Sequence, residues 1–306
     1  MRVVPRYELF FLVFYALLIP LAGGAALLIA GQPELLPFLL PLLALYLFLA
    51  SRRPLRRRRA ARAALPGEWR EFLLAHSAYY RGLADEGRSR FERDLRLFLA
   101  ETRIVGTGGK PVSWRTRLLV GAGAAAMLHG RPDWEPPLTD GVTVYPGQRF
   151  DRNYRPGKGN IAGQAPERGP LLVAEASLEE GFADPHDGYN VLFHELAHFF
   201  DFEARESGMK LRQPPGETLP WARVIDRSYR EHDFASSILP TYAAQNVAEF
   251  FAVASEAFFE NPGRLHAAHP ALFGILMEFY GQDPRAILNG DGLSAGLRPA
   301  PSWMRG

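Results

Sequence analysis

The sequence has no cysteine among its 306 residues. Disulfide bonds and thiolate metal sites are therefore excluded, which fits a reducing compartment. The chain also has no internal repeat. With 47% hydrophobic residues, it has room for one sizeable globular domain and an accessory region.

The chain has little net charge, formally +2, but that charge is unevenly distributed. Residues 1–65 hold nine arginines and two glutamates, whereas the remainder holds 26 lysines and arginines against 31 acidic residues. Seven of the nine arginines of residues 1–65 lie in SRRPLRRRRAAR, residues 51–62, directly after an apolar run. Such a cluster is typical of the cytoplasmic flank of a membrane segment. The rest of the chain is net acidic, which does not support nucleic-acid binding.

Two apolar runs precede the arginine cluster. Residues 9–30 contain no charge and would span about 33 Å as a helix, enough to cross a bilayer. Residues 35–50 would span only about 24 Å and contain two prolines, so this run either crosses a thin or tilted bilayer or re-enters. A secretory signal is the competing interpretation, but the first run is too long and has no obvious small-residue cleavage site. We therefore expect a hairpin that enters the membrane through residues 9–50.

The arginines also predict the orientation of this hairpin. Arg2 and Arg6 precede the first run, seven arginines follow the second, and none lies in the turn at residues 31–34. The positive-inside rule then places both ends of the hairpin in the cytoplasm. We expect a bacterial-type inner membrane protein whose larger part faces the cytoplasm.

One motif has obvious chemical meaning: HELAH, residues 194–198. On a helix, a spacing of four turns the second residue only roughly 40° from the first, so His194 and His198 project from one face. Two imidazoles suit Zn²⁺, and Glu195 would lie beside a metal-bound water as a general base. The implied reaction is hydrolysis. Because the motif fixes only three positions, a structural membrane protein with a coincidental match is an alternative.

The residues around the motif favour a functional site. The rest of the segment is apolar, and a buried His–Glu–His set would have a large desolvation cost unless a metal compensates it. Asp201 is placed to hydrogen-bond a ligand histidine from outside the metal's own shell. Asp187 or Asn190 is placed to cap the helix.

A zinc enzyme needs a third protein ligand and leaves the fourth position to water. The best candidate stretch is TYAAQNVAEFFAVASEAFFENP, residues 241–262, in which Glu249 and Glu256 point the same way. Glu249 has the most apolar neighbours and is the favoured ligand. Glu256 either supports a ligand or is solvated, and Glu260 is expected at the surface. Tyr242, seven residues before Glu249, is close enough to hold its phenol over the metal.

These two segments resemble the Mlc titration factor A family of zinc-dependent peptidases and, more distantly, the catalytic domain of anthrax lethal factor. The resemblance implies that His194, His198 and Glu249 bind Zn²⁺. It also implies that Glu195 is the base and that Tyr242 stabilises the transition state. Similarity extends over roughly residues 66–285, including 68–109, VTVYPGQRF at 142–150 and DGYN at 187–190. Residues 203–220 match no family motif, and the first fifty residues look like an added membrane module.

Periodicity predicts the other elements. Helices are expected over residues 68–84, 89–102, 115–129 and 271–280, with close packing at the small residues 121–126. Strands are expected over 142–145 and 171–176, and an edge strand would pair with the substrate backbone. Residues 151–169 would form a loop lining the cleft. The remaining histidines singled out, His76, His129, His186, His266 and His269, are interpreted as structural, loop or surface residues.

We therefore predict an α+β, mainly α, zincin-like domain of the gluzincin type at residues 66–285. A membrane hairpin with a basic segment, residues 1–65, precedes it, and a flexible tail, residues 286–306, follows. The expected function is Zn²⁺-dependent hydrolysis of peptide or protein substrates at the cytoplasmic face of the membrane. The alternative is a non-catalytic regulator that binds a partner such as a transcriptional repressor, as the name-giving family member implies.

Overall fold

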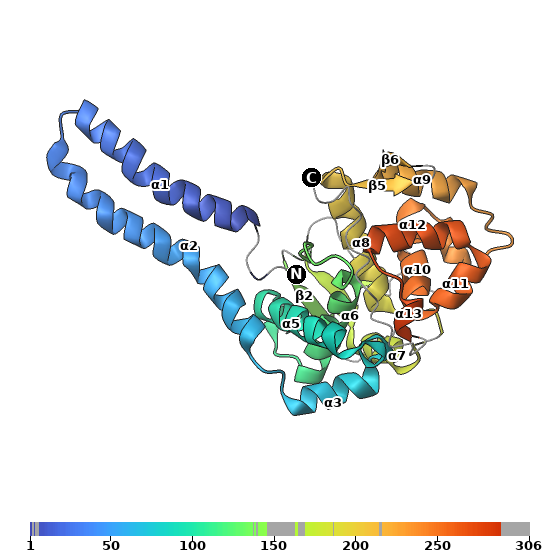
Figure 1. Ribbon diagram of the computed structural model, residues 1–306. Coiled ribbons are helices and arrows are strands. Elements are labelled where there is room, and N and C mark those ends of the chain that lie inside the picture. The colour runs from blue at the N-terminus through green and yellow to red at the C-terminus, as the bar shows by residue number, and fades with distance from the viewer. Residues whose placement is uncertain are drawn as a thin grey trace. The chain divides into compact units, whose positions relative to one another are not determined.

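The structure is a computed structural model with two compact units, Met1–Ala64 and Leu65–Gly306. It describes Met1, Val3 and residues 6–136, 138, 140–145, 163–164, 169–185, 187–213 and 216–288. The expected cleft loop therefore lies largely outside the described residues, and His186 lies wholly outside them. In Figure 1, the colour follows the described elements along the chain, from blue at the N-terminus to red.

The first unit is a helical hairpin. Helix α1 spans Arg6–Ile29, the 3₁₀ helix η1 spans Pro33–Phe38, and α2 spans Leu39–Arg62. Tyr46 Oη donates a 2.8 Å hydrogen bond to the carbonyl oxygen of Phe11, which holds α2 against α1. The segments Glu8–Ile29 and Pro33–Arg62 are long and apolar enough to cross a membrane, by length and composition. The arginine cluster continues α2 without a break.

The second unit is mostly helical, as Figure 1 shows. Its helices are α3 Gly67–His76, α4 Ala78–Gly82, α5 Asp85–Glu101, α6 Trp114–Leu128, α7 Glu175–Ala183, α8 Val191–Glu206, α9 Trp221–Glu231, α10 Val247–Glu260, α11 Pro262–Ala268, α12 Pro270–Tyr280 and α13 Arg285–Leu288. Two 3₁₀ turns are η2 Thr107–Gly109 and η3 Thr241–Ala244. Together with the strands described next, these elements confirm the predicted mainly helical α+β class.

One small sheet has the strand order β1-β2-β4-β3, formed by Ile104–Gly106, Val142–Tyr145, Leu171–Ala174 and Gly163–Gln164 in that order. Strands β1, β2 and β4 are parallel, and β3 is antiparallel to β4. The strand β2 has the predicted bounds. The strand β4 ends two residues earlier than predicted, because Glu175 begins α7.

Residues 203–220, for which we found no motif, complete α8 and form the hairpin of β5 Lys210–Gln213 and β6 Glu217–Pro220. The side chains of Leu211 and Leu219 are buried, so this hairpin belongs to the hydrophobic core. The hairpin leads directly into α9, whose first residue, Trp221, is fully buried.

Besides β4, two expected elements differ from prediction. The helix expected at residues 68–84 is divided at Ser77, whose side chain caps α4 by accepting a hydrogen bond from the Tyr80 backbone. The expected tail begins in a helix, because Arg285–Leu288 forms α13 and Ile287 is buried. Residues 289–306 lie outside the described residues.

The small residues of α6 permit close helix packing, as predicted. A Cβ atom added to Gly123 would lie 2.3 Å from Leu192 Cδ2 on α8, and one added to Gly121 would lie 2.4 Å from Leu95 Cδ1 on α5. Neither position has space for a side chain. This contact fixes α8, the helix of the HELAH motif, against the core.

Candidate metal centre

Helix α8 positions the two motif histidines. Asn190 caps the helix, because its Oδ1 accepts hydrogen bonds from the backbone amides of Leu192 and Phe193 at 3.1 and 3.3 Å. Leu192 and Leu196 are fully buried on the core side. His194 and His198, one turn apart, therefore share the face that remains half-buried.

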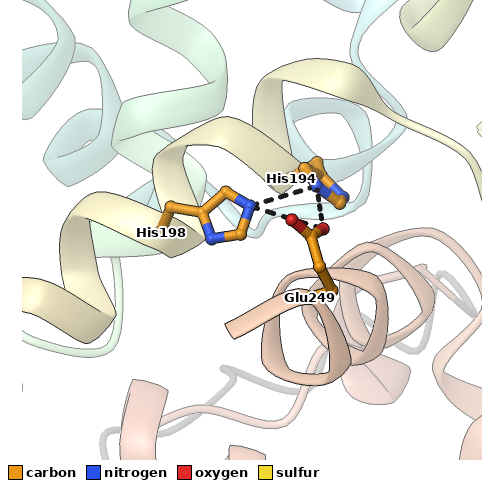
Figure 2. A group of neighbouring side chains, drawn as sticks. All are labelled: His194, His198 and Glu249. Carbon is orange, nitrogen blue, oxygen red and sulfur yellow. Dashed lines mark hydrogen bonds and ion pairs between the residues drawn. The ribbon is translucent and has the colours of Figure 1, made fainter. Parts of the chain in front are cut away.

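Helix α10 packs against α8 and supplies the acidic residues. Asn246 caps it by accepting a 3.0 Å hydrogen bond from the backbone amide of Glu249. Glu249 thus lies in the first turn, and Glu256 lies two turns later on the same face. Figure 2 shows Glu249 pointing from its helix toward His194 and His198 on the other.

The three predicted ligand side chains lie together. His198 Nε2 is 3.2 Å from His194 Nε2, and Glu249 Oε2 is 3.1 Å from His194 Nε2 and 3.7 Å from His198 Nε2 (Figure 2). One ligand atom from each residue falls within 4.8 Å of the others, an arrangement that can hold a metal ion. Among the described residues, no other group of three or more such side chains has this arrangement.

Glu256 contacts the other ring nitrogen of His194. Glu256 Oε1 lies 2.5 Å from His194 Nδ1, and its Oε2 accepts a 3.0 Å hydrogen bond from the Asn190 backbone amide. Of the two roles that the sequence left open for Glu256, support of a ligand histidine is therefore the one found. The contact fixes the orientation of the imidazole and directs Nε2 toward Glu249.

Two predictions around the site are wrong. Glu260, expected at the surface, is buried, and its Oε1 accepts a 3.0 Å hydrogen bond from Asn190 Nδ2. Asp201, expected to contact a ligand histidine, instead accepts hydrogen bonds from Trp221 Nε1 at 2.6 Å and Arg205 Nε at 2.9 Å. Three residues after His198, its side chain is rotated by about 60° and faces α9.

Asn190 has a wider role than the predicted cap. Besides its bonds to α8 and to Glu256 and Glu260 of α10, its Nδ2 donates a 2.8 Å hydrogen bond to the carbonyl oxygen of Gly181 on α7. A Cβ atom at Gly181 would lie 3.1–3.2 Å from Asn190, so the two segments touch. Sequence alone indicated the cap but not these partners, because they lie on two other helices.

Glu195 lies between the two motif histidines in the sequence, and Tyr242 lies seven residues before Glu249. Glu195 is buried, and burial raises the pKa of its carboxyl group. Tyr242 lies in η3, and its ring centroid is 5.9 Å from that of His194. The structure therefore places the tyrosine ring beside the first motif histidine.

The charges of the site favour a cation. Burial opposes ionisation of Glu249, but hydrogen bonds with His194 and His198 hold its pKa well below the usual range. Burial likewise opposes a charged His194, yet the attraction of Glu256 and Glu249 raises the pKa of this imidazole well above its ordinary value. The same negative field would attract a metal ion.

The other described histidines lie apart from this group. His76 stacks on Phe72 with ring centroids 4.1 Å apart, and His129 is buried beside Tyr79. Burial lowers the pKa of His129 to about 3, so this side chain is neutral at physiological pH. His269 Nε2 accepts a hydrogen bond from the Ile238 backbone amide, and His266 is exposed.

We expect Asn190→Ala to lower the free energy of unfolding by about 3–7 kcal/mol. It removes a helix cap, worth about 1 kcal/mol, and leaves the buried Glu260 and Gly181 acceptors without their donor, at about 1–3 kcal/mol each. The matched control is Asn246→Ala, which removes the cap of α10 and should cost only about 1 kcal/mol. Urea unfolding followed by circular dichroism measures both. An equal loss in the two variants would contradict the role of Asn190.

Comparison with known proteins agrees with the resemblance found in the sequence. The model of the glucose-regulated metallo-peptidase M90 family matches residues 52–281. An uncharacterized protein of Synechocystis is 26% identical over 235 residues, covering 72% of this chain and 86% of that protein. Mlc titration factor A of Yersinia pestis is 33% identical over 137 residues, 42% of this chain and 49% of that protein, as is its Yersinia pseudotuberculosis counterpart.

The chain thus spans about half the length of the titration factors that it matches. The match to the family model is longer, and it includes both α8 and α10 with the histidines and glutamates described above. On this evidence, the chain belongs to the glucose-regulated metallo-peptidase M90 family.

Proposed function

We propose that this protein is a zinc-dependent peptidase in which His194, His198 and Glu249 bind the metal, Glu195 is the general base and Tyr242 stabilises the transition state. The observation that supports it best is the meeting of both motif histidines with Glu249 across two helices. Family membership supports the metallopeptidase class, and the substrate would accordingly be a peptide or protein.

The distances fit a zinc ion. In tetrahedral zinc sites with bonds of about 2.0–2.2 Å, neighbouring ligand atoms lie about 3.3–3.6 Å apart. The two histidine nitrogens and the nearest oxygen of Glu249 are separated by 3.1, 3.2 and 3.7 Å. Neutral imidazole nitrogens that face each other at 3.2 Å would repel unless a cation or a proton lies between them. Two imidazoles and one carboxylate are also the donor set of many catalytic zinc sites.

Zinc bound there would polarise the scissile carbonyl and lower the pKa of a water molecule. The residues of the chain then act in order. Glu195 accepts the proton of the attacking water and transfers it to the leaving amine. Tyr242 donates a hydrogen bond to the oxygen of the former carbonyl as negative charge develops on it.

Our first functional prediction concerns the metal. The full chain should bind one Zn²⁺, and replacing His198 or Glu249 by alanine should remove most of it. Glu256→Gln should weaken zinc binding by about 10–100-fold, because it loses only the orienting contact to His194. Metal analysis by mass spectrometry measures all of these, with the exposed Glu203→Ala on α8 as control. Full zinc in Glu249→Ala together with loss in Glu256→Ala would show that the wrong carboxylate was chosen.

A second functional prediction separates the base from the ligands. Glu195→Gln should reduce peptide hydrolysis by about 10²–10⁴-fold and keep its zinc, because the amide cannot accept the proton. Tyr242→Phe should lower kcat by a smaller factor and leave KM nearly unchanged, since it removes one transition-state hydrogen bond. Turnover and metal content are measured on the same preparations. Hydrolysis at the wild-type rate by Glu195→Gln would rule out the proposed mechanism.

A second candidate function is regulation through a bound protein. Relatives with 33% identity are named for titrating Mlc, and we consider a repressor-type partner for this chain on that basis. The Glu195→Gln variant discriminates between the two functions. A purely binding protein would keep its partner and its cellular effect after this substitution, whereas a peptidase would lose its effect.

We also propose that the hairpin anchors the protein in the inner membrane with both of its ends in the cytoplasm. The support is the length of Glu8–Ile29 and Pro33–Arg62 and the mean hydropathy of an 18-residue stretch within each, 2.3 and 1.9, together with the arginines at the end of α2. These arginines would lie at the cytoplasmic headgroups.

A reporter enzyme that is active only outside the cytoplasm tests this orientation. Fused after Gly306 it should be silent, and inserted after Gly31, in the turn between the helices, it should be active. The second fusion is the control for expression and insertion. Activity of the Gly306 fusion would contradict the proposed topology.

A further inference from the structure

A small pocket lies beside the start of α8 and the end of α10. Its volume is about 20 Å³. Phe193, on α8, and Glu260, at the end of α10, both contribute to its wall. His76, which also lines it, is exposed, so the pocket can be reached from solvent.

Glu260 gives this pocket its chemical character. The residue is 3% exposed, and its Oε1 accepts a hydrogen bond from Asn190. The other oxygen, Oε2, is buried and has no hydrogen-bond partner. A buried carboxylate oxygen in this position is unfavourable unless a donor or a positive charge meets it.

Aromatic side chains form much of the remaining wall. Tyr79, Phe182, Phe193 and Phe259 all line the pocket. The negative faces of aromatic rings attract ammonium groups, most strongly where water is excluded. No lysine or arginine is among the described residues that line the pocket.

The surrounding charges have the same sign. The ionisable groups that act most on Glu260 are Asp187, Glu256 and Asp184, all of them carboxylates. Burial raises the pKa of Glu260 well above its ordinary value, and these three neighbours raise it further, so the carboxyl group gives up its proton only when a cation lies beside it. An anion would be repelled from this pocket, whereas a cation would be attracted.

We propose that this pocket is a binding site for a primary ammonium group, with Glu260 as its counter-ion and the aromatic rings as its walls. The size selects the group, because a cavity needs roughly 10–15 Å³ to hold one water and this one can therefore hold roughly one to two non-hydrogen atoms. Methylammonium has that size. The site uses none of the ligand residues, so the inference does not depend on the proposed hydrolysis.

The test uses the full chain in detergent and ¹³C-labelled methylammonium chloride, with binding followed by the NMR line width of the methyl group. Sodium chloride keeps the ionic strength constant. We expect saturable binding, and at least tenfold weaker binding in Glu260→Gln, which keeps the acceptor for Asn190 but removes the charge. Glu203→Gln, an exposed glutamate on α8, is the matched control and should bind as the wild type does.

A second variant guards against a folding defect in Glu260→Gln. Ala78 lines the pocket and is half-buried on α4, so Ala78→Leu should fill the cavity without touching the carboxylate. It should also bind at least tenfold more weakly, and its circular dichroism spectrum should match that of the wild type. Tetramethylammonium should not compete, because it is too large. Absence of saturable binding in the wild type, or equal affinity in a folded Glu260→Gln or Ala78→Leu, would overturn the proposal.

Discussion

The packing of α8 against α10 is the constraint on which the candidate centre depends. Two carboxylates of α10, two turns apart, meet the two ring nitrogens of one imidazole on α8. Glu249 faces Nε2 of His194 and Glu256 faces Nδ1, so the ring has no freedom to turn. On its other side, Phe251 of α10 packs on Trp221 at 5.0 Å, which prevents the helix from rotating. A shift of either helix by one residue would separate all of these pairs.

Asn190 connects this packing to the rest of the domain. Its side-chain oxygen caps α8, and its backbone amide donates a hydrogen bond to Glu256. Its side-chain nitrogen Nδ2 donates hydrogen bonds to Gly181 on α7 and to Glu260 at the end of α10. One residue thus fixes where α8 starts and how its first histidine is oriented. The position of that helix along its axis is fixed separately, by the contact of Gly123 with Leu192. The geometry of the site is therefore determined mainly outside the ligand residues.

The sequence predicted those features of the site that are determined within a single helix. The spacing of His194 and His198 fixes their common face whatever surrounds them, and the same argument placed Glu249 and Glu256 together. The resemblance to a known family indicated Glu249 as the partner of these histidines, but other partners that depend on a second helix were predicted poorly. Glu260 seemed exposed because it ends its helix, but Asn190 and α7 cover it. Asp201 was paired with the wrong residue because its partner, Trp221, follows a β-hairpin that no recognised motif indicated.

The charges buried between the two helices explain why this interface needs cations. Glu249 and Glu256 both contact the imidazole of His194, and both carboxylates are buried or half-buried. Neutral imidazoles cannot compensate two negative charges, and attraction to these glutamates already raises the pKa of His194. Protonation of His194 would compensate part of the negative charge, but it would remove the nitrogen lone pair that a metal ion requires. A divalent ion among His194, His198 and Glu249 compensates the same charge without a proton. Burial of these carboxylates between α8 and α10 is unfavourable by itself, and it therefore favours the binding of a metal ion.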